Sequence, residues 1–93
     1  MSEDKPELDL PDLDFVTFVM SVIGSALVHL GDAPHPDGAA EEANLVLAKQ
    51  DIALLELLQE KTHGNLSGEE ERVLTQGLDD LRLRFLEVSK ATG

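Results

Sequence analysis

The chain has 93 residues, of which seven are basic and nineteen acidic, giving a formal net charge of −12 at pH 7. This length accommodates one domain, and this charge repels phosphate backbones and anionic lipid head groups, which disfavours nucleic-acid and membrane partners. The absence of Cys, Tyr and Trp excludes thiolate chemistry and removes most of the aromatic platforms on which bases and sugar rings stack.

The first thirteen residues, MSEDKPELDLPDL, combine acidic residues with three leucines and two prolines. This composition predicts a flexible acidic tail over residues 1–13. The alternative is a short motif that docks Leu8, Leu10 and Leu13 on a partner. A secretory signal begins with basic residues, so the acidic start, together with the lack of cysteines, favours a cytoplasmic protein.

The first predicted helix spans residues 14–30 and carries the segment FVTFVMSVIGSALVHL. Asp12 and Asp14 are its N-cap candidates and Gly31 its C-cap. Apolar residues surround this helix almost completely, so it must be buried in a large core, a membrane or an oligomer interface. Sixteen residues span only ~24 Å of the ~30 Å hydrocarbon layer, so membrane association is the weaker alternative.

Two neighbouring helices cannot cover that circumference, so we expect a homodimer with the first helix at or near its two-fold axis. Ser21, Gly24 and Ser25 form a small-residue patch that would allow close helix approach. The competing possibility is a monomer whose first helix is enclosed by the other two. The interface expected for the dimer comprises Phe15, Phe18, Val19, Val22, Ile23, Ala26, Leu27 and Leu30.

A loop rich in Pro, Gly and Asp follows over residues 31–39, and the second helix is predicted at residues 40–63. Its start moves to Asn44 if that residue is the N-cap. A third helix is predicted at residues 67–90, and residues 91–93 form a disordered end. Helical spacing of three and four repeats in both segments, through Leu45, Ala48, Ile52 and Leu55 and then through Leu74, Leu78, Leu81, Phe85 and Val88. No strand pattern occurs, so we predict a single all-α, three-helix domain over residues 14–90.

The polar stretch EKTHGNLSGEEE, residues 60–71, has a structural explanation. Lys61 suits a helix C-terminus, and Gly64 provides the positive φ that follows a C-cap. Ser67 and Glu70 have the spacing of a capping box. The stretch therefore predicts a helix-turn-helix connection made by Lys61, Thr62, Gly64, Asn65, Leu66, Ser67 and Glu70.

A metal-binding helical protein is the alternative function. Glu60 and His63 have the Glu-x-x-His spacing of di-iron helical bundles, and His29 and His35 are further nitrogen ligands. The chain contains no second Glu-x-x-His pair, phosphate loop or Gly-x-Ser-x-Gly motif. We therefore predict a protein that is not an enzyme and has no cofactor.

Several residue groups resemble the bacterial domain-of-unknown-function family 1844. The most specific is Lys61-Thr62-x-Gly64-Asn65-Leu66, and the resemblance covers roughly residues 15–88. The supporting positions are Phe18, Ser25-Ala26-Leu27, Leu30-Gly31, Pro36, Leu45, Ala48, Ile52, Leu54-Leu55, Glu70-Glu71, Leu74, Leu81 and Arg82. The resemblance implies a compact bacterial domain with no established activity, cofactor or partner. The resulting expectation is a self-associating interaction or scaffold module whose protein partner is unknown.

Overall fold

The computed structural model describes residues 13–33 and 43–92, which form three α-helices and no strand. The helices are α1, Phe15–His29; α2, Leu45–Lys61; and α3, Gly68–Thr92. The predicted all-α fold is therefore confirmed. The acidic tail up to residue 12, the loop of residues 34–42 with His35, and Gly93 lie outside the described residues.

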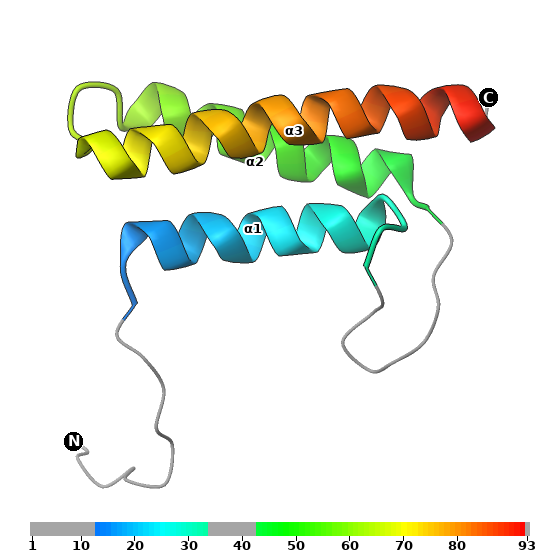
Figure 1. Ribbon diagram of the computed structural model, residues 1–93, viewed down its shortest axis with the longest axis horizontal. Helices are drawn as coiled ribbons and strands as arrows, with labels where there is room; N and C mark the ends of the chain where they lie inside the picture. Colours follow the sequence, from blue (N-terminus) through cyan, green and yellow to red (C-terminus); the bar gives the residue numbers. More distant parts are fainter. Residues whose placement is uncertain (1–12, 34–42, 93) are drawn as a thin grey trace, which may run out of the picture.

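The three helices lie side by side, with α2 running opposite to both α1 and α3 (Figure 1). Each helix contacts the other two, so the core lies along the common axis of the bundle. The longest helix, α3, has 25 residues and continues through Ala91 to Thr92, beyond the predicted end at residue 90. None of the helices in the described part of the chain has the length and apolar character needed to cross a bilayer.

Side-chain and backbone caps explain where α1 begins and ends. Asp14 is the N-cap, and its carboxylate accepts a hydrogen bond from the Thr17 amide at 2.8 Å. At the other end Gly31 has φ +84°. Its amide donates to the Val28 carbonyl at 3.0 Å, and the Asp32 amide donates to the Leu27 carbonyl at 2.9 Å. These two bonds form a Schellman motif, which requires a residue such as glycine in the left-handed region.

The start of α2 is at Leu45, which corrects the predicted start at residue 40. Asn44 is extended, with φ −123° and ψ 92°, and its side chain caps the Leu47 amide. Its own amide donates to the His29 carbonyl at 2.6 Å, so the beginning of α2 is held against the end of α1. The alternative start at an Asn44 cap is the one observed.

The turn between α2 and α3 is made by the residues of the polar stretch. The last residue of α2 is Lys61, two positions before the predicted end, and Gly64 has φ +85°. Ser67 and Glu70 then bond reciprocally: the Ser67 amide donates to Glu70 Oε1 at 2.8 Å, and the Glu70 amide donates to Ser67 Oγ at 3.1 Å. This capping box starts α3.

The core consists of one stripe from each helix. Its buried members are Val19, Val22 and Ala26 on α1 with its C-cap Leu30, Ala48, Ile52 and Leu55 on α2, and Leu74, Leu78, Leu81 and Val88 on α3. Phe85, the remaining position of the predicted α3 stripe, is half-buried against this cluster. The periodicity therefore identified the buried sides of α2 and α3 correctly.

Gly77 allows α1 and α3 to approach closely. A Cβ atom added at this position would lie 2.5 Å from Ile23 Cδ1 and 3.3 Å from Ile23 Cγ1. Glycine inside a helix costs ~1 kcal/mol relative to alanine. The space that a side chain at position 77 would take is filled by Ile23 of α1.

An ion pair connects the end of α1 to α3. Arg84 donates through Nε to Asp32 Oδ2 at 2.6 Å and through Nη2 to Asp32 Oδ1 at 2.7 Å, a two-bond geometry that suits guanidinium and carboxylate. These bonds, opposed by partial burial, hold the pKa of the Asp32 carboxyl below its ordinary value of 3.8.

Replacing Gly77 with Ala tests the contact with Ile23. In the wild-type chain the new methyl group must displace Ile23, which offsets the ~1 kcal/mol that alanine gains in a helix, so we expect no net stabilisation. In an Ile23→Ala background the same replacement should stabilise the fold by about 1 kcal/mol. Urea unfolding of the four chains measures this coupling, and a coupling near zero would contradict the packing described.

Replacing Asp32 with Asn tests the ion pair through its pH dependence. Because the folded-state pKa of Asp32 is lowered, its stabilising contribution is complete above the ordinary value of 3.8 and is lost as the pH falls through the folded-state value. We expect the difference in unfolding free energy between wild type and Asp32→Asn to shrink as the pH falls below 3.8. Asp80→Asn is the control, because Asp80 is exposed and has no hydrogen bond or ion pair among the described residues.

Candidate interaction surface

An apolar row lies on the side of α2 that points away from the core. Val46, Gln50, Ala53 and Leu57 follow one another at helical spacing, and Leu47 and Leu54 flank the row. We call these six residues the α2 outer face. Val46 is 78% exposed, Leu57 49%, Leu54 41% and Leu47 39%. α2 therefore has a buried apolar side and, nearly opposite to it, an exposed one.

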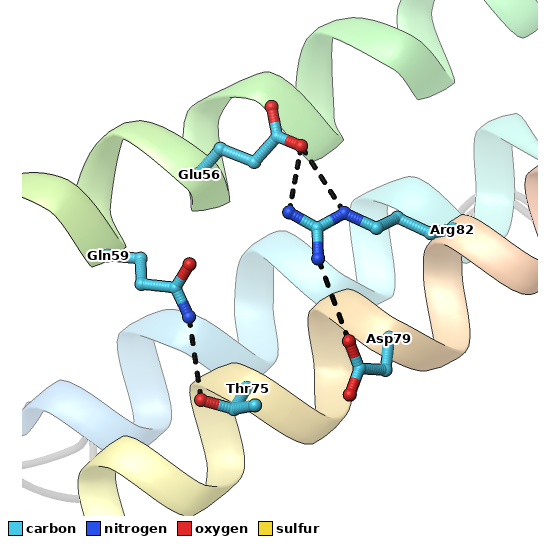
Figure 2. Close-up of polar contacts among 5 residues, drawn as sticks. All are labelled: Glu56, Gln59, Thr75, Asp79 and Arg82. Carbon is cyan, nitrogen blue, oxygen red and sulfur yellow. Dashed lines mark hydrogen bonds and ion pairs between the residues drawn. The ribbon is translucent and has the colours of Figure 1, made fainter.

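Polar contacts with α3 hold one flank of α2 (Figure 2). Arg82 donates to Glu56 Oε2 through Nη2 at 2.9 Å and through Nε at 3.3 Å. Its Nη1 lies 3.6 Å from Asp79 Oδ1 on the same helix. Gln59 Nε2 donates to Thr75 Oγ1 at 3.4 Å one turn further along α2. These contacts are mostly exposed, so they orient the two helices more than they stabilise them.

A less exposed polar cluster holds the opposite flank of α2 against α1. His29 Nδ1 lies 2.6 Å from Asp51 Oδ2, and Ser25 Oγ donates to the same oxygen at 3.4 Å. The side chains of His29 and Asp51 are 24% and 16% exposed. Although the residue types are Ser, His and Asp, the serine bonds to the carboxylate and not to the imidazole. A serine nucleophile needs a neighbouring base to take its proton, so the cluster is a bridge between helices.

The metal-ligand candidates are separated in the fold. His29 pairs with Asp51 in the first half of α2, whereas Glu60 and His63 are exposed at the other end of that helix. Glu60 is nine positions after Asp51, which is ~14 Å along a helix. The described residues contain no group of three or more His, Asp or Glu side chains arranged to hold a metal ion. His35 lies outside the described residues.

The residues expected at a dimer interface on the first helix divide into two groups. Val19, Val22, Ala26 and Leu30 are buried inside the single chain by α2 and α3. Phe15, Ile23 and Leu27 pack partly against that core, and only Phe18, 39% exposed, is left largely open. The outward side of α1 carries mainly small and polar residues, including exposed Thr17 and Ser21 and half-buried Gly24, and its one further exposed large side chain among the described residues is Met20, at 54%. α1 therefore offers less free apolar surface than α2.

Two shallow grooves border the bundle. One, of about 420 Å³, lies between α1 and α3 and is lined by apolar side chains including Met20, Ile23 and Leu27, with Asp80 and Arg84 also in its lining. The other, of about 380 Å³, lies between α2 and α3 and includes Ala53 and Leu86. Because Ala53 belongs to the α2 outer face, the second groove extends that face toward α3.

The sequence pattern did not single out the α2 outer face. Val46, Leu47 and Leu57 belong to none of the motifs identified in the sequence, and Leu54 belongs only to the family resemblance. The signal was present, because Val46, Ala53 and Leu57 are also spaced by seven and four residues. The bridge of His29 and Asp51 carried no sequence signal, since the two residues are 22 positions apart.

Comparison with known protein families gives a match over most of the chain. The family model of the domain of unknown function DUF1844 matches residues 12–87. No curated protein and no solved structure gives a significant match to the chain. The matched segment includes α1, α2 and most of α3. The chain therefore belongs to the DUF1844 family of domains of unknown function.

Proposed function

We propose that this protein is a non-enzymatic interaction module that pairs with a second copy of itself through the α2 outer face. The observation that carries the proposal is the row of exposed apolar side chains on α2. Soluble monomeric proteins rarely leave contiguous apolar patches without a function. A second copy is a suitable occupant because the same face, met across a two-fold axis, is apolar on both sides.

The size of the face sets the strength of this association. The exposed fractions of Val46, Leu47, Leu54 and Leu57 together amount to about two whole side chains per copy, or about four in a pair. At ~1.5–3 kcal/mol for each side chain, their burial is worth roughly 6–12 kcal/mol. Association itself costs ~4–15 kcal/mol. The balance predicts a weak dimer that dissociates on dilution.

Charge acts against this association and also shapes what the dimer presents. Each copy carries a net charge of −12, so two copies repel one another at low ionic strength. Pairing through α2 leaves the outward side of α3 free, including Glu69, Asp79 and Glu87, all of which are exposed. An acidic surface of this kind attracts a basic partner protein, which agrees with a scaffold role.

Replacing Leu57 with Glu should weaken self-association. The change removes an apolar side chain from both copies and adds two charges to the seam, so we expect the midpoint concentration of association to rise by at least about tenfold. Mass measurement by sedimentation over a dilution series up to about 1 mM, at about 0.15 M ionic strength to screen repulsion beyond ~8 Å, provides the test.

Leu83→Glu is the matched control. Leu83 is 60% exposed and lies on the outward side of α3, so its replacement should leave the midpoint nearly unchanged. A wild-type chain that stays monomeric throughout the dilution series would refute self-association. Equal effects of the two replacements would show that the α2 outer face is not the interface.

A further inference from the structure

We infer that the two copies pair with their α2 helices antiparallel, in a register that places Val46 opposite the partner's Leu57. The inference rests on the proposed self-association and specifies its geometry. In a two-fold pair each contact occurs twice, because residue i meets residue j and residue j meets residue i. When the helices run in opposite directions, residue numbers rise along one helix while they fall along the other. The residue numbers of any two facing residues therefore add up to about the same value.

The α2 outer face of one copy meets the α2 outer face of the other when the residue numbers of each facing pair add up to about 103. Val46 then faces the partner's Leu57, and Gln50 faces the partner's Ala53. On the flank toward α1, Leu47 comes opposite the partner's Leu54, with a sum of 101, which is a displacement of only ~3 Å along the axis. Each of the four exposed apolar side chains, Val46, Leu47, Leu54 and Leu57, thus meets another apolar side chain.

The flank toward α3 supplies charge complementarity in the same register. Lys49 and Glu56 both line the groove between α2 and α3, so they lie on the same flank of the helix. Lys49 has no ion-pair partner among the described residues. In the antiparallel pair Lys49 lies opposite the partner's Glu56, with a sum of 105, within reach of two long side chains. Glu56 is nearly half exposed although it contacts Arg82, so its carboxylate can accept a further contact.

A parallel pair would bring equal residues together only along the middle of the face. The two-fold axis would then run along the helices, so each flank would meet the opposite flank of the partner. Lys49 and Glu56 would therefore lie opposite the partner's apolar flank of Leu47 and Leu54, and neither would gain a partner of opposite charge. The helix dipoles give the same preference, because antiparallel helices place the positive end of one beside the negative end of the other. The matching of apolar flank with apolar flank, and of Lys49 with Glu56, therefore selects the antiparallel orientation, whereas burial of the central row alone would permit both.

Single-cysteine variants distinguish the two orientations. The natural chain has no cysteine, and positions 46 and 57 lie about 16 Å apart along α2, well beyond the ~7 Å Cα separation that a disulfide spans. We expect mild oxidation of an equimolar mixture of Val46→Cys and Leu57→Cys chains to yield the mixed disulfide in several-fold excess over either symmetric product. Intact-mass spectrometry separates the three products, because the two variants differ in mass.

Each outcome of the crosslinking experiment has a distinct meaning. Symmetric disulfides at position 46 and at position 57, each forming in the absence of the other variant, would overturn the antiparallel register while leaving self-association intact. A dimer by mass that gives no enriched disulfide would overturn the register and place the seam elsewhere. A monomer throughout the dilution series would refute both the register and the proposed function.

Reversing the charge of Lys49 provides an independent test. In the antiparallel pair, Lys49→Glu creates two new Glu–Glu contacts, and we expect the association midpoint to rise several-fold, more strongly at low salt. In a parallel pair Lys49 would lie opposite the partner's apolar flank, so the same change would create no Glu–Glu contact between the copies. Arg72→Glu changes the net charge by the same amount at an exposed position in α3, so it measures general repulsion alone. Equal effects of the two replacements would contradict the inference.

Discussion

The organisation of this domain depends on one geometric constraint: three helices packed around a common axis cover one side of each helix, and α2 has two apolar sides. Ala48, Ile52 and Leu55 fill the core. Val46 and Leu57, nearly opposite them, remain exposed. No rotation of α2 could bury both sides within a bundle of this size, so the chain either leaves apolar area in water or covers it with a second molecule.

Polar contacts on both flanks of α2 fix which side faces outward. Asp51 accepts one hydrogen bond from Ser25 and contacts His29 on α1, while Glu56 accepts two bonds from Arg82 on α3. The two contacts lie on opposite flanks, so a rotation of α2 in either direction would break one of them. The exposed contact of Glu56 with Arg82 contributes little free energy, yet the two contacts together select the orientation of the helix.

The same constraint has a different result for α1. This helix is the most apolar of the three, but its outward side carries Thr17, Ser21 and Gly24. Most of its large side chains pack against α2 and α3, while Met20 stays 54% exposed. Close approach to α3 at Gly77 lets Ile23 fit against the neighbouring helix. A helix that is apolar on nearly all sides can therefore be accommodated in a small domain when its small residues gather on the side left open.

The sequence by itself determined the features that depend on neighbours in the chain. The helix type follows from apolar spacing, and the helix ends follow from caps such as Asp14, Gly31 and the pair of Ser67 and Glu70. The predicted ends of α2 and α3 each differ by two residues from the observed ends at Lys61 and Thr92, because helix ends carry weak local signals. Only the tertiary structure decided which apolar side of α2 is exposed and which residues bridge the helices. The physical reason is that helix rotation is set by simultaneous packing against two distant segments, as in the contacts of Asp51 with His29 and of Gly77 with Ile23, and no local pattern records those contacts.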